Sequence, residues 1–488
     1  MTTIKQITQA LSNQFNAVLG RKQKFVELIQ NGDISRLLSK MTTCNDKITK
    51  ALAEYDPTKH EVTKRPNRHR KGKPDIITAK LPIPFQKVIN LQATAFLFGS
   101  PIQFSDISDV IETSINGELN RKSKAEEAYS RFLQILKDTR FDSNIRECKM
   151  KAGSETLCAK LYHLYLSTNG EIQVMVKILA KSLGDDIYYK FDDFGRLMLF
   201  IRQFTIQDDE GNDEIHCDIY TDETIFRCTQ KAIGWEVLPE KNFIGKIPVL
   251  LYRQEPEWAD VQKLIERRED IQCRDADMND YFANPKVVGE GIVDGSLNPD
   301  DPAQIIQTQN NGKVYYLTYD SAPENRKREC DTLDSFIYGM TCSVNPASDV
   351  IKEMKIPSGV SWEYMFFFPM LKAKNYQDYY GAMIDREINV VKAVIGVLYP
   401  ELKLNGQLEA LKIGYQFSTP MPDNVSDTLD IIQKSINTGT MSQETAIYQN
   451  PRIKDPKIEI ERLKSEKGQS DIDIPDNQKK NLDSLAEK

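Results

Sequence analysis

Residues 242–281 read NFIGKIPVLLYRQEPEWADVQKLIERREDIQCRDADMNDY, and the change of pattern within this stretch decides the fold. Its first part is a short apolar run with Gly245 and Pro248, which is typical of a strand and its turn. After Trp258 the residues become polar, and the apolar ones recur at helical spacing in a narrow stripe: Val261, Leu264, Ile265, Ile271 and Met278. A helix of this kind packs along one seam and stays wet elsewhere. The stretch therefore predicts a strand that leads into a long polar helix over residues 258–284.

The segments on either side of this helix complete the pattern. Downstream, residues 285–319 hold two β-like runs between Gly- and Pro-rich turns, and residues 324–344 form a second amphipathic helix. Upstream, short alternating runs with Asp/Gly turns fill residues 160–255, where Asn169-Gly170 gives the strongest hairpin signal. We therefore expect an antiparallel sheet domain, followed by two helices with a compact β insert between them.

The remaining segments are mostly helical by their periodicity. Helices are expected within the first 55 residues, with Asp33 as an N-cap, and at 84–98, 125–149 and 361–397. Pro369 lies inside the last of these and should kink or split it. The basic run KHEVTKRPNRHRKGKPD at 59–75 could touch DNA or an acidic partner, but a loop solvated on all sides is the simpler interpretation.

Composition narrows the class of protein. The chain has 488 residues, of which 28% are charged and 40% hydrophobic, as in a soluble globular protein with more than one packed unit. No apolar stretch reaches the roughly 18 residues of a membrane span, and the first residues lack a basic segment followed by an apolar block, so we expect no export signal. The eight cysteines form no C-x-x-C pair and only four histidines are present, so we expect no metal site and no cofactor. The net charge of −7 argues against binding nucleic acid through a general basic surface.

Five stretches, in this order and with these gaps, resemble the siphovirus-type portal proteins of tailed bacteriophages. They are FQKVINLQATAFLFGSPIQF (85–104), KAGSETLCAKLYHLYLSTNGEI (151–172), residues 242–281, NPASDVIKEMKIPSGVSWEYM (345–365) and MSQETAIYQNPRIKDPKIEIERLKSEK (441–467). Together they span roughly residues 80 to 467. Two positions depart from the family pattern: Leu157-Cys158 replaces small and aromatic residues, and Ile356-Pro357-Ser358-Gly359 stands where Asn-x-Ser-Gly is frequent.

The resemblance implies an α+β portal fold, ring-forming, with a mixed α/β wing, a two-helix stem, a small α/β clip insert and an α-helical crown. The implied segments are the wing (1–255), a stem helix (256–284), the clip (285–320), a second stem helix (321–343), the tunnel loop (344–360), the wing's long helix and strand (361–420), the crown (421–467) and a disordered tail (468–488).

The resemblance also implies a place and partners. The subunit, made in the host cytoplasm, would form a dodecameric ring at the portal vertex of the capsid, and the ring would be the channel for DNA packaging and ejection. Its partners would be other copies of the chain, double-stranded DNA in the channel, the terminase large subunit, head-completion or adaptor proteins, and the major capsid and scaffolding proteins. No membrane, no cofactor and no catalytic residue are implied.

Three groups of residues are candidates for contacts in such a ring. The tunnel-loop candidates for the DNA channel are Lys352, Glu353 and Lys355, which suit solvated loop charges equally well. The stem candidates are Lys263, Arg267, Arg268 and Arg274, most of which are expected to pair with acids of neighbouring subunits or to face solvent. The clip and subunit-contact candidates are Val287, Val288, Ile292, Ile305, Ile306, Val314, Tyr315 and Tyr316. A short insert cannot bury so many apolar residues alone, although packing under the wing is the alternative.

Two other interpretations remain open at this point. Asp185-Asp186 or Asp192-Asp193 could form a metal-dependent nuclease site, although adjacent carboxylates before Gly more often make turns. No Walker loop, G-x-S-x-G or H-E-x-x-H motif is present. The second alternative is another capsid-associated structural protein, such as a minor head or adaptor component. The chain length and the helix–insert–helix order favour the portal.

Overall fold

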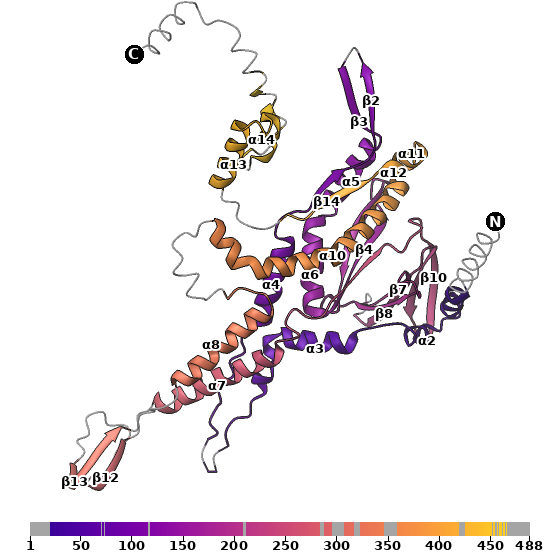
Figure 1. The fold of residues 1–488 in the computed structure, drawn as a ribbon. Helices are drawn as coiled ribbons and strands as arrows, with labels where there is room; N and C mark the ends of the chain where they lie inside the picture. Colours follow the sequence, from indigo (N-terminus) through magenta and orange to yellow (C-terminus); the bar gives the residue numbers. More distant parts are fainter. Residues whose placement is uncertain are drawn as a thin grey trace, which may run out of the picture. The chain divides into compact units, whose positions relative to one another are not determined.

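The computed structural model describes residues 20–69, 71–72, 74–115, 118–207, 211–283, 287–294, 307–316, 323–345, 359–418 and 425–450, with scattered positions in 452–465. The chain divides into two compact units. One comprises Met1–Ile351 with Phe366–Pro420, and the other comprises Lys352–Met365 with Met421–Lys488. The first unit holds both large sheets (Figure 1).

Two antiparallel sheets form the middle of the first unit. The larger has the strand order β10-β9-β8-β7-β6 and the smaller has the order β11-β4-β5. The strands are β4 (Leu157–Leu166), β5 (Ile172–Leu179), β6 (Asp186–Phe191), β7 (Leu197–Gln207), β8 (Asp213–Tyr220), β9 (Thr224–Gln230), β10 (Trp235–Lys241) and β11 (Val249–Arg253). The hairpin predicted at Asn169-Gly170 joins β4 to β5, and the φ of 79° at Gly170 is one that glycine adopts without strain.

Both faces of the larger sheet are covered. Along β7, Leu199 and Ile201 pack on one side, while Phe200 faces the smaller sheet, as the alternation of a strand requires. Helical residues 20–30 and α2 (Ile34–Leu38) cover the first side, and α3 (Asn45–Tyr55) joins the core between the sheets. Asp33 precedes α2 as predicted, but its side chain makes no capping hydrogen bond.

Helices cover the outer face of the smaller sheet. They are α4 (Phe85–Phe98), α5 (Glu126–Asp138), α6 (Phe141–Glu155) and the 40-residue α10 (Gly359–Leu398). The single helix expected at 125–149 is wrong, because Arg140, with a φ of 53°, separates α5 from α6. Pro369 does not split α10, which runs through it as one helix. Short elements complete the unit: α11 (Pro400–Leu404), α12 (Gln407–Ala410), β1 (Gln103–Asp106) paired with β14 (Ile413–Gln416), β2 (Val110–Ile115) paired with β3 (Glu118–Ser123), and η3 (Lys181–Leu183).

Helices α7 (Gln262–Ala283) and α8 (Pro323–Met340) lie side by side and form what we call the arm (Figure 1). Ile271, Cys330 and Leu333 pack between them. At the base of the arm, Trp258 and Ile337 join residues of α4 in one apolar cluster. The insert between the two helices contains β12 (Val287–Asp294) and β13 (Gln307–Tyr316), which pair antiparallel. The helix–insert–helix order expected from the sequence is therefore present.

The basic run at 59–75 is not solvated on all sides. The short helices η1 (Pro57–Lys59) and η2 (Glu61–Lys64) open it, and the following residues fold back on themselves, with two backbone hydrogen bonds of 3.0 Å between Arg68 and Ile76. Arg65 binds Asp277 of α7 at 3.0 Å, and its side chain is only 19% exposed. The run is thus a hairpin fastened to the arm at its base.

In the second unit, α13 (Val425–Asn437) and α14 (Gln443–Gln449) form a helix pair within the segment 421–467, for which helices were expected. Ser442 caps α14 by accepting the backbone N–H of Thr445 at 3.1 Å, which satisfies a donor that the helix leaves free. Among the helices that the structure describes, none is long and apolar enough to cross a lipid bilayer.

Candidate functional site

The four basic residues predicted for the first stem helix lie on α7 and do not share one face. Lys263, Arg267 and Arg274 are four and seven residues apart, so they line one flank of the helix. Their side chains are 89%, 48% and 61% exposed, whereas that of Arg268, which points to α8, is 14% exposed. This flank presents a row of cations to whatever lies beside the arm.

Each of these cations has an acidic partner in its own chain. The pairs are Lys263–Glu266 (2.7 Å), Arg267–Glu329 (2.9 Å), Arg268–Asp334 (2.9 Å) and Arg274–Asp270 (2.9 Å). Exposed pairs of this kind add little stability, but they offset the charge of the row. Contact of these cations with DNA or with a neighbouring subunit remains a prediction.

A buried carboxylate, that of Glu257, holds the base of the arm. Its side chain is fully buried just before α7. Lys149 of α6 donates to Oε1, and Lys372 of α10 donates to Oε2 at 2.6 Å. Gln254 Nε2 adds a hydrogen bond of 2.9 Å to Oε1, and the hydroxyl of Tyr376 adds one of 3.2 Å to Oε2. One carboxylate thus joins α6, α10 and the start of α7.

The charges around Glu257 keep it ionised. Burial alone would raise its pKa, but the ammonium groups of Lys149 and Lys372 outweigh burial and lower the pKa to about 2. Lys372 also donates to the carbonyl oxygen of Thr341, just past the end of α8, at 2.9 Å. A cation at a helix C-terminus offsets the partial negative charge there. Lys372 therefore ties the end of α8 to the start of α7.

A second buried ion pair connects the smaller sheet to α10. Lys160 of β4 binds Glu387 of α10 at 2.7 Å, and both side chains are 1% exposed. The hydroxyl of Tyr162 donates to the same carboxylate oxygen. Burial and the neighbouring Glu387 charge raise the pKa of Tyr162, so this hydroxyl stays protonated and available as a donor. The long helix is thereby fixed to the sheet by directional bonds as well as by apolar packing.

An extended strap, residues 79–83, lies against the side of α7 away from α8. The backbone N–H groups of Ala79, Leu81 and Ile83 bind the side chains of Asp277 (2.7 Å), Cys273 (3.1 Å) and Glu269 (2.7 Å), respectively. Four helical residues rise about 6 Å and two extended residues about 6.6 Å, so every second residue of the strap meets the next turn of α7. The strap therefore runs antiparallel to the helix with a matched repeat.

His60 also binds the carboxylate of Glu269, which accepts the N–H of Ile83 from the strap. Its Nδ1 lies 2.6 Å from Glu269 Oε1, and its Nε2 lies 2.8 Å from the carbonyl oxygen of Glu54. Both partners only accept hydrogen bonds, so both ring nitrogens must donate, as they do in the imidazolium form. Burial lowers the pKa of His60, but the hydrogen bond and charge of Glu269 outweigh it, and the pKa is raised. Residues 54–83 thus brace the arm along one side.

The other predicted site residues are only partly visible. Lys352, Glu353 and Lys355 of the tunnel loop, and Ile305 and Ile306 of the insert, lie outside the described residues. The backbone register of the insert pairs Val287 with Tyr316 and Val288 with Tyr315, and places Val314 opposite Gly289 and Ile292 opposite Gln309. The strands are therefore as predicted, and subunit contacts through their side chains remain a prediction.

The carboxylates considered for a nuclease site serve separate local structures. Asp185 binds Arg202 at 2.5 Å, and Asp186 binds Lys181 at 2.6 Å. Asp192 accepts the backbone N–H groups of two later residues in a turn, as predicted for such a pair, and Asp193 binds Arg21 at 2.6 Å. In the described ranges, no three His, Cys, Asp or Glu residues gather closely enough to hold a metal ion.

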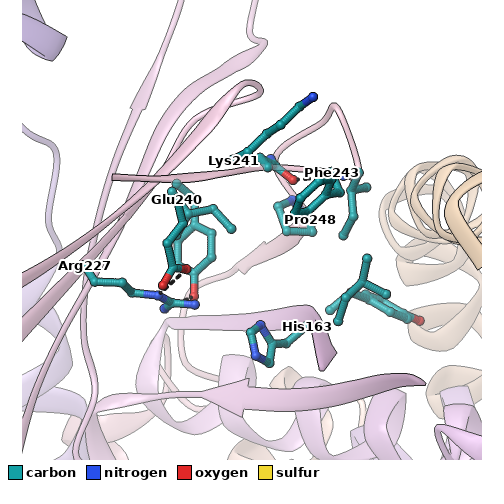
Figure 2. Close-up of a pocket in the computed structure, with 12 residues that line it drawn as sticks. His163, Arg227, Glu240, Lys241, Phe243 and Pro248 are labelled. Carbon is teal, nitrogen blue, oxygen red and sulfur yellow. Dashed lines mark hydrogen bonds and ion pairs between the residues drawn. The ribbon is translucent and has the colours of Figure 1, made fainter. Parts of the chain in front are cut away.

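A pocket of about 260 Å³ opens between the two sheets (Figure 2). Figure 2 shows Arg227 and Glu240 paired on one wall, at 3.3 Å, and Arg227 also binds Asp218 at 2.6 Å. His163 lies on the floor, and burial, with the charge of Arg227, lowers its pKa. Arg227 and Glu240 are engaged in ion pairs of the larger sheet, Lys241 lies over the ring of Phe243, and the rest of the lining is mainly apolar.

Comparison with known proteins gives the family. The family model described as phage portal protein, SPP1 Gp6-like, matches residues 34–473, which is most of the chain. No curated protein matches the sequence. Portal proteins are structural components of the phage virion, placed at the capsid vertex, and are not enzymes. The helix–insert–helix arm, its braced base and this match along nearly the whole sequence lead to one conclusion: the chain belongs to the SPP1 Gp6-like family of phage portal proteins.

Proposed function

We propose that the chain forms a dodecameric ring at one capsid vertex, through which DNA enters during packaging and leaves during ejection. In this ring the arm is the stem, residues 285–320 are the clip, residues 344–360 form the tunnel loop and residues 421–467 form the crown. The wing comprises residues 1–255 and 361–420. The terminase large subunit, and later the head-completion or adaptor proteins, dock on the clip, while the major capsid and scaffolding proteins surround the wing.

The observation that carries this proposal is the arm of a chain that belongs to the portal family. Two long helices leave a single root, where Glu257 and Lys372 tie their ends together. The insert at the other end of these helices is a two-stranded sheet. An isolated two-stranded sheet is marginally stable in water, so partners are needed to support it. Neighbouring clips in a ring would supply that support through Val287, Val288, Ile292, Ile305, Ile306, Val314, Tyr315 and Tyr316.

The charge of the chain suits a channel that must let DNA slide. A ring repeats each exposed charge in every subunit, so one lysine facing the axis becomes a belt. A subunit with a net charge of −7 repels phosphates from most of its surface, and a few basic positions touch them lightly. We propose Lys352 and Lys355, with Glu353 between them, as the belt of the tunnel loop, and the exposed row of Lys263, Arg267 and Arg274 as a second one.

Electron microscopy of the purified protein tests the ring and the clip together. Wild type should give closed rings with a central hole. Replacing residues 285–319 by a short flexible linker should abolish the rings or their binding to terminase, because the surface that neighbouring clips and terminase would contact is then gone. Deleting residues 468–488 is the matched control and should leave the rings intact. A wild-type sample of solitary globules, or normal packaging by the clip deletion, would contradict the proposal.

A further inference from the structure

The basic hairpin, residues 65–78, has no role in the function proposed above. Residues 64–73 read KRPNRHRKGK, with six lysines and arginines and no acidic residue. The whole chain carries a net charge of −7, so this run stands out against an acidic background. Because like charges repel one another, such a run keeps one conformation only if other contacts of the fold hold it.

The fold does hold it, because the two strands of the hairpin are tied together. Arg68 and Ile76 exchange two backbone hydrogen bonds of 3.0 Å. The hydroxyl of Thr78 donates to the carbonyl oxygen of Pro66 at 3.2 Å, and the N–H of Thr78 donates to Asn67 Oδ1 at 3.3 Å. The hairpin is therefore preorganised, which reduces the entropy that a binding partner must overcome.

Its base is fastened to the arm and is electrically neutral. Arg65 donates to the carbonyl oxygen of Ala79 at 2.7 Å and to Asp277 Oδ2 at 3.0 Å, while Asp277 Oδ1 accepts the N–H of Ala79. The strap continues this contact along α7, and its direction carries the hairpin toward the end of α7 at Ala283, where the insert begins. The tip therefore projects near the insert end of the arm.

Beyond the base, the cations that the structure describes are exposed and largely without counter-charges. The side chain of Arg68 is 60% exposed and reaches Asp277, already bound to Arg65, only at 3.6 Å. Lys71 is exposed and has no acidic partner among the described residues. His69 is 83% exposed and binds Asp75 at 2.8 Å. The described cations Arg68 and Lys71 thus extend into water from a hairpin whose base is held to the arm.

We infer that the basic hairpin binds the phosphate backbone of duplex DNA. Phosphates offer one sign of charge at regular spacing, which matches residues 64–73, whose charged side chains are all cations. A protein surface presents mixed charges, and lysine is depleted from protein interfaces. Such a contact would hold DNA without reading its sequence, because only backbone groups take part. The inference goes beyond the channel proposed above and needs no ring, since one hairpin suffices.

Fluorescence anisotropy with a labelled duplex of about two helical turns tests the inference on the full-length chain. The double variant Arg68→Gln/Lys71→Gln removes two exposed cations of the described part of the hairpin and, at the base, only the 3.6 Å contact of Arg68 with Asp277, while the bonds of Arg65 to Asp277 and Ala79 stay. Each lost phosphate contact lowers the salt slope by about 0.9, so the double variant should lose a slope of about 2 and bind at least about tenfold more weakly at low salt. The matched control is Lys47→Gln/Lys50→Gln, which removes two exposed cations of α3 and should leave DNA binding unchanged.

The outcomes separate the possible partners and the possible failures. Absence of DNA binding by wild type, or equal affinity and salt slope in the hairpin variant, would overturn the inference and leave an acidic protein surface as the partner. Equal losses in the control variant would also overturn it, because general charge would then explain the binding. Ile77, 80% exposed near the base of the hairpin, offers an apolar contact to a protein and none to a phosphate, so Ile77→Ser should leave DNA binding unchanged. Mass photometry of the same samples reads ring formation separately, so failure of the ring and failure of the hairpin remain distinguishable.

Discussion

Replacing the buried carboxylate at the base of the arm should weaken the arm far more than any surface change nearby. The variant Glu257→Gln keeps the size of the side chain and removes its charge. Lys149, which is fully buried, would then face a neutral amide, and one of the two amide orientations would set an NH₂ group against an ammonium. Two cations that share one carboxylate would be left without a counter-charge.

The size of the effect follows from burial. Removing one partner from a buried ion pair costs about 3–5 kcal/mol, because the remaining charge stays in a poorly solvated site. We expect a loss in this range for Glu257→Gln, at the upper end if Lys149 keeps its proton. Glu255→Gln is the matched control, because Glu255 lies two residues away and its pair with Lys47 has both side chains about two-thirds exposed. Exposed pairs of this kind are worth little, so the control should behave like wild type.

Hydrogen exchange with mass spectrometry measures the effect where it arises. Peptides that cover the start of α7 and the end of α8 should exchange faster in Glu257→Gln, while peptides from the larger sheet keep their protection. In thermal unfolding, we expect wild type and Glu255→Gln to have the same melting temperature and Glu257→Gln to have a lower one. If the two variants lose protection equally, the carboxylate does not hold the arm and the reasoning fails.

The pH dependence of stability is a second test of the role of Glu257, because wild type and Glu257→Gln should respond to pH differently. In wild type, the pKa of Glu257 is lowered to about 2, so its contribution is complete above the unfolded value near 4.5 and is lost as the pH falls toward 2. In the variant, burial lowers the pKa of Lys149 with no carboxylate to oppose it. The unfolded chain then binds more protons than the folded one up to about pH 10.5, and the stability of the variant rises with pH. The difference in the free energy of unfolding between wild type and Glu257→Gln should therefore shrink at both low and high pH.

Three further substitutions probe the other contacts. His60→Gln should destabilise the brace most below pH 6.5, and the difference from wild type should shrink as the pH rises through the raised pKa of His60, as measured by thermal unfolding across pH. Glu387→Gln should cost about 3 kcal/mol in denaturant unfolding, whereas adding Lys160→Met should recover most of the loss, because no buried charge is then left alone. Gly153→Ala should lower the melting temperature despite the better helix propensity of alanine, since its Cβ would overlap the side chain of Asn90.

The arm and the sheets were predictable because their signals are local. The stripe of Leu264, Ile265 and Ile271 sets the helical period of α7, and Asn169-Gly170 fixes one hairpin by its backbone preference. The break between α5 and α6 was missed, because it lies at Arg140, which takes a left-handed conformation, and no glycine stands there to indicate one. For elements of this kind, pattern and turn chemistry decide the outcome before tertiary contacts form.

The contacts at the base of the arm were not predictable, because their partners are far apart in sequence. Lys149, Glu257 and Lys372 each look like surface charges in a chain that is 28% charged. Only a signal such as Lys160 inside the apolar run LCAKLYHLYL hints that a charge is buried, and it does not name its partner. The strap was hidden for another reason: backbone groups make its contacts, and the pattern of side chains does not report them.

The use of charge rather than apolar packing at the base of the arm has a geometric reason. Apolar contacts are non-directional and tolerate small rotations, whereas a carboxylate held by Lys149 and Lys372 fixes both distance and angle. In the ring proposed above, every subunit must present its arm at the same angle, because a closed ring permits only one rotation per subunit. Small errors in that angle would add up around the ring and prevent closure. Directional bonds at the base, the strap and His60 on one side, and the Lys160–Glu387 pair behind α10 together restrict the arm to one direction, which closure requires.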